Sequence, residues 1–365
     1  MKINNIKLST YDIIDGMSDW IRVIDENNNI IFANRAMCEG LSKDIFGMKC
    51  YEAIGKSMPC ENCISRRAVF EGKAHSKEEI VGNRVFSVMS SPVHNEFGEV
   101  VAVVEVLRDI TEMRRLQKRI LDQNQKLQRD VEAAKLLHSQ LLPVNFNHKG
   151  VNFSYTYLPC DDLGGDFIDI FLIDKDHIGL YVADVSGHGL AASLLTVFLY
   201  STMDKKSLSP SQALSELFNK FAENSFKEDY YITVFYAILD LRTKSLTFSN
   251  AGHNACPVAF NKNKLEFLRS PGFPISNWTD TPGYCDGTLN LDKGDRIFFY
   301  TDGIVEIRNS KNQQYGEERI LDIILNNKGT PKEVLDVMLN SFSTFTGTKR
   351  PTFYDDITIS ILEIE

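Results

Sequence analysis

The chain has 365 residues, a formal net charge of −9 at pH 7 and an apolar content of 43%. This length predicts about two or three domains, and the apolar content is sufficient for a sizeable core. The acidic balance excludes a general nucleic-acid-binding protein, which would carry a basic face. The longest uncharged stretch, residues 189–203, is shorter than a membrane span and predicts a buried helix, so we expect no membrane partner.

The cellular compartment is predicted from two features of the sequence. The first twelve residues contain no apolar segment of the signal-peptide type. The seven cysteines form no even, regular framework, and a reducing compartment is the default for such a pattern. We therefore expect a cytoplasmic protein.

Residues 1–108 are predicted to form a small α+β domain. The segment WIRVIDENNNIIFANRAM predicts a strand, an Asn-rich turn, a second strand and the start of a helix, and residues 84–112 predict two long strands joined by a turn at residues 95–98. The opening IDENNNIIFANRAM and the exit GEVVAVVEVLRDITE resemble a PAS sensor domain over the whole segment. An unrelated α+β module is the alternative.

Four cysteines of this first domain form a candidate cofactor site: Cys38, Cys50, Cys60 and Cys63. Cys60 and Cys63 form a CxxC pair, which can hold Zn²⁺ or an iron–sulfur cluster or act as a redox dithiol. The other spacings match no strong zinc pattern, so four ordinary thiols are the alternative.

Residues 109–142 are highly charged, lack Gly and Pro, and predict a coiled-coil linker helix. Two columns with heptad spacing run along it: Ile110, Gln117, Asn124, Val131 and His138, and Met113, Ile120, Leu127, Ala134 and Leu141. This 3–4 alternation is typical of a two-stranded coiled coil, and a buried Asn favours a parallel dimer. A second register through Leu116 and Leu137 could serve as a switch. The alternative is one amphipathic helix packed on its own domain.

Residues 143–365 are predicted to form one domain in which adjacent strands pair antiparallel, because short turns join several of them. Strands are expected near 151–158, 166–173, 178–184, 230–240, 245–250, 284–290, 295–301 and 354–363, and helices near 189–203, 210–226, 315–326 and 331–344. The predicted fold class is therefore multidomain α+β: the α+β domain, the helical linker, and an α-β-β-α sandwich of two antiparallel sheets flanked by helices.

Aspartates follow or precede several apolar strands of this domain, at Asp166, Asp184, Asp302 and Asp355. Clustered carboxylates repel one another and resist desolvation, and a divalent cation makes such a cluster tolerable. Carboxylate and water ligands suit Mg²⁺ or Mn²⁺. A pair of such ions can activate a water and hold phosphoryl oxygens.

Five motifs occur here in order: DDLGGDFIDI, ADVSGHGLAA, NAGHN, FFYTDGIVE and YDDITI. Together they resemble the SpoIIE/RsbU-type branch of the metal-dependent serine/threonine phosphatases, the type 2C superfamily, over residues 136–365. The resemblance implies two ions held by Asp184, the Val185 carbonyl, Asp302 and Asp355, with Asp166 bound directly or through water. It implies hydrolysis of phosphoserine or phosphothreonine without a phosphoenzyme.

Several residues near these motifs admit two readings. His188 can protonate the leaving seryl oxygen or can serve only the bend, and Asp302-Gly303 can be a hairpin turn. Only the family pattern prefers Asp355 to Asp356. Asn250, His253 and Asn254 are expected to form a supporting loop, and Asp169 to be a strand residue or an outer partner of the site.

The sequence also departs from related patterns in two places. GGDF at residues 164–167 is similar to the hairpin of diguanylate cyclases but lacks one acidic residue. Many type 2C enzymes carry a phosphate-binding arginine near the start of the domain, yet no Arg lies between Pro143 and Asp184. The metal ions must then carry most of the phosphate charge, or Lys175 assists; a turn residue is the other reading of Lys175.

The predicted function is a PAS-regulated protein phosphatase that dimerises through its linker. The resemblance implies a phosphoserine protein of the anti-anti-sigma (STAS) type as substrate. We also expect the sensor to order or disorder the segment of residues 161–166. The alternative is a catalytically silent phosphatase fold that relays the sensor state to a partner, although every acidic ligand position is filled.

Overall fold

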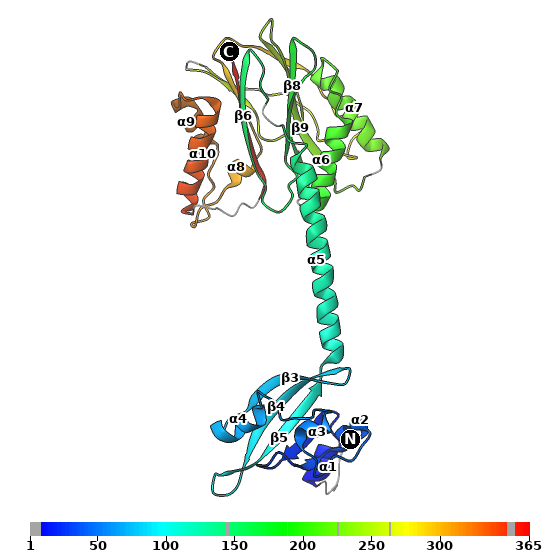
Figure 1. The fold of residues 1–365 in the computed structure, drawn as a ribbon. Helices are drawn as coiled ribbons and strands as arrows, with labels where there is room; N and C mark the ends of the chain where they lie inside the picture. Colours follow the sequence, from blue (N-terminus) through cyan, green and yellow to red (C-terminus); the bar gives the residue numbers. More distant parts are fainter. Residues whose placement is uncertain (1–8, 144–145, 188, 225, 263, 349–354) are drawn as a thin grey trace, which may run out of the picture. The chain divides into compact units, whose positions relative to one another are not determined.

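The structure is a computed structural model that describes residues 9–143, 146–187, 189–224, 226–262, 264–348 and 355–365. It divides into two compact units, one within residues 1–126 and one comprising residues 127–365 (Figure 1). The boundary falls inside helix α5 (Thr111–Ser139), whose first half therefore belongs to one unit and second half to the other.

The first unit is an α+β domain, as the sequence predicts. Its described strands form an antiparallel sheet in the order β2-β1-β5-β4-β3. The strands are β1 (Trp20–Ile24), β2 (Ile30–Ala33), β3 (His75–Val81), β4 (Arg84–His94) and β5 (Val100–Asp109). The helices before α5 are α1 (Thr10–Asp15), α2 (Arg35–Leu41), α3 (Cys50–Ala53) and α4 (Ile64–Glu71).

The core of this first unit lies between one face of the sheet and the helices. Phe86 and Val88 of β4 and Val103 and Leu107 of β5 are buried at alternate positions, because side chains on a strand point to opposite faces. Met37 of α2 is buried in the same cluster. The two-residue period thus sets the inner face of the sheet.

The second unit contains two further antiparallel sheets, ordered β13-β10-β9-β8-β7 and β12-β11-β14-β15-β6 among the described residues. The strands are β6 (Val151–Leu158), β7 (Phe167–Leu172), β8 (His177–Val185), β9 (Ile232–Asp240), β10 (Ser245–Ala251), β11 (Val258–Phe260), β12 (Leu265–Phe267), β13 (Gly287–Asn290), β14 (Arg296–Tyr300) and β15 (Ile357–Ile364). The helices are α6 (Leu190–Thr202), α7 (Pro210–Glu223), α8 (Gly303–Glu306), α9 (Glu317–Asn326) and α10 (Pro331–Thr346).

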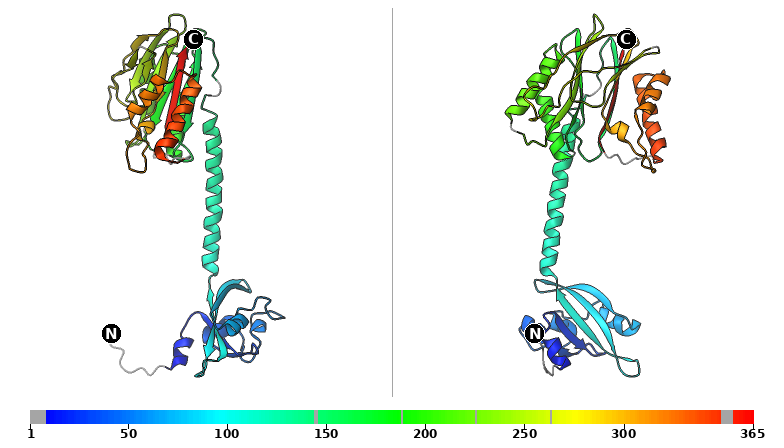
Figure 2. Two further views of the ribbon diagram at one scale, coloured as in Figure 1. Left: turned by 90° about the vertical axis from the view of Figure 1, so that its left-hand side faces the viewer. Right: turned by 180° about the vertical axis from the view of Figure 1, so that it is seen from behind.

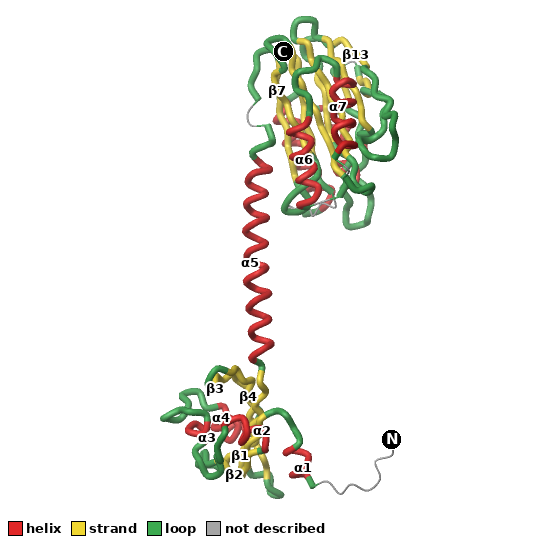
Figure 3. The backbone as a smooth tube through the Cα atoms, turned by 90° about the vertical axis from the view of Figure 1, so that its right-hand side faces the viewer, coloured by secondary structure: helices red, strands yellow, loops and turns green. Residues whose placement is uncertain are grey.

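The two sheets pack face to face with helices on both outer sides, which confirms the predicted α-β-β-α sandwich (Figure 2). In β8, Leu180 and Val182 point into the core between the sheets, whereas Tyr181 and Ala183 point toward α6 and α7. Figure 3 shows α6 and α7 side by side on the sheet that β7 and β13 bound. Helices α9 and α10 cover the other sheet.

In the described part of the second unit, three short elements escaped prediction: β11, β12 and α8. Each has only three or four residues, too few to show a period. The hairpin-turn reading of Asp302-Gly303 was wrong, since Asp302 is the N-cap residue of α8.

Helix α5 is uncovered over much of its length. Every residue from 112 to 130 is exposed, including the apolar Met113, Leu116, Ile120 and Leu127. The reading of an amphipathic helix packed on its own domain was therefore wrong for this stretch. Within the described residues, none of the helices has the length and apolar character needed to cross a membrane.

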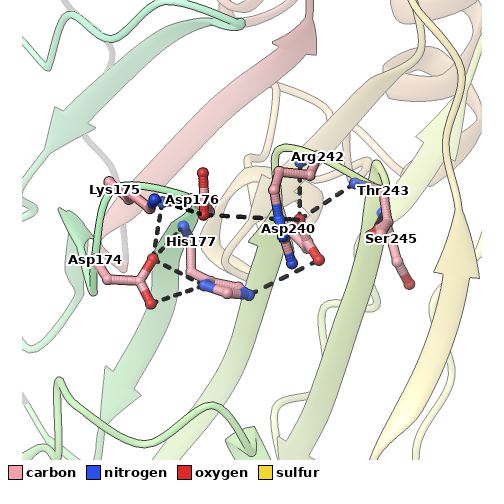
Figure 4. A network of polar contacts seen from close by, with 8 residues as sticks. All are labelled: Asp174, Lys175, Asp176, His177, Asp240, Arg242, Thr243 and Ser245. Atoms are coloured by element: carbon pink, nitrogen blue, oxygen red, sulfur yellow. Dashed lines mark hydrogen bonds and ion pairs between the residues drawn. The ribbon is translucent and has the colours of Figure 1, made fainter.

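A network of hydrogen bonds and ion pairs lies at one end of the sheet that contains β8 (Figure 4). At the start of β8, His177 Nδ1 lies 2.8 Å from Asp174 Oδ1. In the β8–β9 register, His177 is opposite Asp240. Lys175 lies in the same turn, and its Nζ is 4.0 Å from Asp176 Oδ2. Asp184 is at the opposite end of β8, so Lys175 is a turn residue and the idea that it assists phosphate binding was wrong.

Candidate functional site

Asp166 and Asp184 lie opposite each other at one end of their sheet. Strands β7 and β8 pair antiparallel with Phe167 opposite Ala183, and each of these residues adjoins one of the aspartates. Asp166 is 2% exposed, and Asp184 is partly buried. The register of one hairpin therefore brings together two carboxylates that are 18 positions apart.

Asp302 and Asp355 lie at one end of the second sheet for a similar reason. Strand β14 pairs antiparallel with β15, with Tyr300 opposite Ile359. Asp302 follows the end of β14 and Asp355 precedes the start of β15, so both fall at the same edge. Antiparallel pairing thus places them together although 52 residues of chain separate them.

Buried hydrogen bonds join these two edges across the sandwich. The Thr301 hydroxyl donates to Asp166 Oδ2 at 2.6 Å, and the Thr358 hydroxyl donates to the same oxygen at 2.8 Å. The Thr358 amide donates in turn to Thr301 Oγ1 at 2.9 Å. A carboxylate of one sheet is therefore fixed by two hydroxyls of the other, which orients Asp166 inside the core.

Glycines allow the backbone segments of this region to approach closely. A Cβ at Gly165 would lie 2.7 Å from the Val185 carbonyl oxygen, and one at Gly303 would lie 2.0 Å from the Asp356 carbonyl oxygen. Both distances are shorter than any real Cβ contact. The predicted close approach of the GG pair to the site is therefore present. Gly303, just after β14, likewise allows the backbone to approach Asp356, just before β15.

The electrostatics of the four aspartates show how near they lie to one another. Burial, and after it the charges of Asp302 and Asp355, raise the pKa of Asp184 to about 8. Burial and the charge of Asp184 raise the pKa of Asp166 well above its ordinary range. Burial and the charge of Asp302 raise the pKa of Asp355. The edges of the two sheets thus form one acidic cluster of Asp166, Asp184, Asp302 and Asp355.

Asp356 has a different environment from Asp355. Its Oδ1 accepts a hydrogen bond from the Cys160 amide at 2.8 Å, and its Oδ2 accepts one from the Gly165 amide at 2.5 Å. Both oxygens of this buried side chain are thus used to hold the segment before β7. This arrangement supports Asp355 as the residue of the pair available to a ligand.

Asn250 and His253 of the NAGHN segment form the predicted supporting loop, which reaches the Asp184 backbone, whereas Asn254 is exposed. His253 Nε2 lies 2.9 Å from the Tyr300 carbonyl oxygen, which can only accept, so this nitrogen carries a proton. His253 Nδ1 lies 3.2 Å from Thr233 Oγ1, and that hydroxyl lies 3.2 Å from the Asp184 carbonyl oxygen. Asn250 Oδ1 accepts from the His253 amide at 2.7 Å, which fixes the loop.

Two further predicted site residues have different outcomes. His188 lies outside the described residues, so its proposed role stays a prediction. Asp169 forms a buried ion pair with Lys205 at 2.6 Å, and the Lys205 ammonium lies 3.7 Å from the centre of the Tyr200 ring. Asp169 therefore holds α6 and the residues after it against the sheet.

The donor set of the acidic cluster fits hard divalent cations. Among the described residues, no Lys, Arg or His forms an ion pair with Asp184, Asp302 or Asp355. Carboxylate and backbone carbonyl oxygens are the ligands that Mg²⁺ and Mn²⁺ prefer, and cations would offset the repulsion that raises these pKa values. The groups able to hold such ions are Asp184, the Val185 carbonyl, Asp302 and Asp355. The more deeply buried Asp166 lies next to them.

Two parts of the chain match known protein families. Residues 174–365, more than half of the chain, match the model of stage II sporulation protein E (SpoIIE). The chain belongs to the SpoIIE family. Residues 14–115 match the PAS fold, so the first unit is a PAS domain. Both resemblances inferred from the sequence are confirmed.

Relatives of this SpoIIE-family chain include two proteins of Bacillus subtilis (strain 168). It is 27% identical over 189 residues to the phosphoserine phosphatase RsbU, covering 50% of this chain and 56% of RsbU. It is 24% identical over 184 residues to the phosphoserine phosphatase RsbP, covering 49% of this chain and 45% of RsbP. The chain spans 38% to 56% of the length of the curated relatives it matches.

One solved structure supports the fold of this SpoIIE-family chain. The SiaA-PP2C domain of Pseudomonas aeruginosa superposes with a TM-score of 0.58 at 19% identity, covering 66% of this chain and 98% of that domain. At this identity the likeness concerns the fold alone. The diguanylate cyclase reading of GGDF was wrong, because residues 164–166 lead into β7, which begins at Phe167 and belongs to a sheet of the sandwich.

Sequence reasoning missed several contributors to the site of this family member. Thr301 and Thr358 stand beside predicted ligands, but an ordinary Thr in a strand gives no signal of its own. Cys160 matches no sequence motif for a site, yet its Sγ and one oxygen each of Asp355 and Asp356 lie within 4.8 Å of one another. Burial, and after it the charge of Asp356, raise the pKa of this thiol to about 12, so it stays protonated.

The four cysteines of the PAS domain do not form one cluster. Cys50, Cys60 and Cys63 line a common cavity of about 20 Å³. Cys38 lies on α2, where burial and then the charges of Asp44, Asp15 and Glu39 raise its pKa. The predicted four-cysteine site is thus reduced to three thiols.

Proposed function

We propose that this chain is a metal-dependent protein serine/threonine phosphatase. The observation that carries the proposal is the acidic cluster, in which edges of two sheets present four carboxylates to one another. Membership of the SpoIIE family and similarity to two proteins named phosphoserine phosphatases support the same reaction.

The cations proposed for this site are two Mg²⁺ or Mn²⁺ ions held by Asp184, the Val185 carbonyl, Asp302 and Asp355, with Asp166 bound directly or through water. When bound, such ions lower the pKa of a coordinated water and neutralise phosphoryl oxygens, which is the chemistry of hydrolysis without a phosphoenzyme. Because no Arg lies between Pro143 and Asp184, most of the phosphate charge would fall to the ions.

The protein's own side chains hold this site in shape. Thr301 and Thr358 fix the Asp166 carboxylate, and Asp356 fixes the backbone amides of Cys160 and Gly165. These contacts are buried, so the ligands are ordered before a substrate arrives, which lowers the cost of binding. We propose that His188 donates a proton to the leaving seryl oxygen.

A substitution separates this function from that of a catalytically silent binding protein. Asp184→Asn keeps the shape of the side chain but removes a charged ligand, so we expect nearly all turnover of a phosphoserine protein with Mn²⁺ to disappear. Asp176→Asn, in the turn at the opposite end of β8, is the matched control and is expected to keep wild-type turnover. Wild-type phosphate release in Asp184→Asn, or none from the unaltered chain, would favour the binding protein.

For the substrate, we propose a phosphoserine protein of the anti-anti-sigma (STAS) type. RsbU and RsbP are named phosphoserine phosphatases, which supports phosphoserine as the group removed. The test is phosphate release from a purified STAS protein phosphorylated on serine, compared with the same protein phosphorylated on threonine. Faster release from an unrelated phosphoserine protein would contradict this substrate assignment. We propose the cytoplasm as the location, since all seven cysteines are free thiols.

We also propose that two chains associate through α5. The exposed apolar residues Met113, Ile120 and Leu127 follow one another at intervals of seven, the repeat of a coiled-coil core. The polar Asn124 lies between them at the other core position, where an Asn selects a parallel dimer in register. Val131 and Ala134 are partly buried, so the uninterrupted exposed stretch ends at residue 130, and Leu136 and Leu137 are exposed again after it.

The C-terminal end of α5 contacts the segment that precedes Asp166 and helix α6, which follows Asp184. These two contacts support a route for regulation. His138 Nε2 lies 2.8 Å from Thr196 Oγ1 of α6, and Lys135 Nζ lies 3.5 Å from Asp162. We propose that movement of α5 orders or disorders residues 161–166. Thr196→Val in the full chain removes the buried hydrogen bond and keeps the shape, so the Mn²⁺ concentration for half-maximal turnover should shift. An unchanged value would contradict this route.

A further inference from the structure

Three thiols of the PAS domain suggest a chemical activity distinct from the phosphatase site. We propose that Cys60 and Cys63 form a peroxide-sensitive dithiol, in which Cys60 reacts first and Cys63 then closes a disulfide. This activity does not depend on the proposed phosphatase function, and its test does not use phosphate release.

The position of Cys60 makes it accessible from two sides. With Cys50 and Cys63 it lines the enclosed cavity of about 20 Å³, which is room for about one water-sized molecule. Cys60 also lines an open pocket together with residues 55–62 and Lys77. A small oxidant from solvent can thus reach the sulfur of Cys60, whereas Cys50 is buried.

Two lysines form a cationic environment around Cys60. Lys56 Nζ lies 3.5 Å from Cys60 Sγ. The same ammonium lies 2.7 Å from Glu79 Oε1, and Lys77 Nζ lies 2.6 Å from Glu79 Oε2. Two ammonium groups therefore share one carboxylate, and one of them also contacts the Cys60 sulfur. The thiolate is the nucleophilic form of cysteine, and an adjacent ammonium stabilises it.

The other two candidate thiols are in unsuitable surroundings for the first step. Burial raises the pKa of Cys50 to about 11, so this thiol stays protonated at neutral pH. Burial raises the pKa of Cys38, and the charges of neighbouring acidic residues raise it as well. Cys63 lies three residues after Cys60, at the N-cap position of α4, and lines the same cavity. It is therefore the partner best placed to attack an oxidised Cys60.

The arrangement favours dithiol chemistry over a metal centre. Zinc bound by thiolates requires Zn–S distances of about 2.3 Å, which places the sulfurs roughly 4 Å apart. A disulfide needs only two sulfurs, and the segment of residues 60–63 is short and partly exposed.

The reaction balances with a hydroperoxide as the oxidant. The Cys60 thiolate attacks one peroxide oxygen, so an S–O bond forms, the O–O bond breaks, and the second oxygen leaves as hydroxide or alkoxide and takes up a proton. The Cys63 sulfur then attacks the sulfenic sulfur of Cys60, an S–S bond forms, and the S–O bond breaks with loss of water. The two thiols lose two electrons, and the peroxide gains them.

Contacts of α4 connect this dithiol to the strand that leads into α5. Ser65, two residues after Cys63, donates a hydrogen bond to Glu105 of β5. Glu105 is 2% exposed and also pairs with Arg22 at 2.6 Å, and Arg22 donates to the Cys50 carbonyl oxygen. A disulfide at the N-terminus of α4 would therefore act on a buried network that includes β5.

The test uses the full-length chain, a slight molar excess of hydrogen peroxide, quenching by alkylation, and peptide mass spectrometry. Cys285 is the control, because it is an exposed free thiol of the same protein. We expect Cys60 to be consumed about ten-fold faster than Cys285 and a Cys60–Cys63 disulfide to form with loss of two hydrogens. In Cys63→Ser, the sulfenic acid should persist on Cys60 and react with dimedone.

A pair of substitutions tests the role of the cation. Lys56→Met removes the ammonium next to Cys60 and should slow its oxidation, whereas Lys56→Arg keeps a positive charge and should preserve most of the rate. Equal consumption of Cys60 and Cys285 would overturn the proposal. A disulfide from Cys60 to a cysteine other than Cys63, or an unchanged rate in Lys56→Met, would overturn it as well.

Discussion

The acidic cluster predicts a conflict between stability and metal binding, which Asp184→Asn should expose. The pKa of Asp184 is about 8 in the folded chain, against an ordinary value of 3.8, because burial and then the charges of Asp302 and Asp355 oppose ionisation. Between these two values the folded chain retains a proton that the unfolded chain releases. Stability of the metal-free protein therefore falls as pH rises through this window.

The size of the effect follows from the width of the window. Each pH unit costs about 1.4 kcal/mol, so the interval from 3.8 to pH 7 gives an upper value of about 4 kcal/mol. Partial exposure of Asp184 and coupling to its acidic neighbours reduce this value to roughly 2 kcal/mol. Asparagine has no proton to retain, so metal-free Asp184→Asn should be more stable than the unaltered chain at pH 7.

The assay is thermal unfolding of the full chain with EDTA and with Mn²⁺. For a unit of this size, 2 kcal/mol corresponds to a rise in Tm of about 4 °C or more. With Mn²⁺ the order should reverse, because the unaltered chain gains about 2.7 kcal/mol at a metal concentration of 100 Kd and the variant lacks a ligand. Asp176→Asn is the control and should show neither effect.

The pH dependence supplies the decisive check on this reasoning. In EDTA the advantage of Asp184→Asn should shrink as pH falls toward 4, where the unfolded chain is protonated too. If the variant is no more stable than the unaltered chain at pH 7 without metal, or if its advantage does not change with pH, the acidic cluster is not the strained arrangement described above.

Three further predictions concern the supports of the site and the linker. Thr301→Val removes one of two hydroxyl donors to Asp166, and we expect a loss of about 1–2 kcal/mol in unfolding free energy together with weaker Mn²⁺ binding, measured by denaturant titration and calorimetry. Gly303→Ala would bring a Cβ within 2.0 Å of the Asp356 carbonyl oxygen, so we expect a loss of more than about 3 kcal/mol in the same titration; wild-type stability would contradict the packing of β14 against β15. Ile120→Lys combined with Leu127→Lys places charges on the proposed core positions, and sedimentation should show a monomer with unchanged helix content; an unchanged mass would contradict pairing through α5.

The sequence was sufficient for the order and type of most elements. The continuous apolar run of residues 178–182 predicts a buried strand, and β8 is that strand, buried on both faces. Aspartates at the ends of apolar strands predict a shared edge, because antiparallel pairing brings distant strand ends together. Family motifs added the choice of Asp355 over Asp356, which periodicity alone leaves open.

The remaining features depended on long-range packing. Asp356, and not Asp355, turns its oxygens to the amides of Cys160 and Gly165, a choice made by chain segments nearly 200 residues away. Thr301 and Thr358 reach Asp166 only because the two sheets face each other. Short elements such as α8 carry no period that a sequence could reveal.

The same division applies to the PAS domain and the linker. The sequence by itself determined a CxxC pair and a heptad pattern, because both are local spacings along the chain. Only the tertiary structure decided that Cys50 joins the pair, that Cys38 does not, and that Lys56 lies beside Cys60. Local spacing fixes which residues can meet within an element, whereas the burial of apolar faces against each other fixes which elements meet.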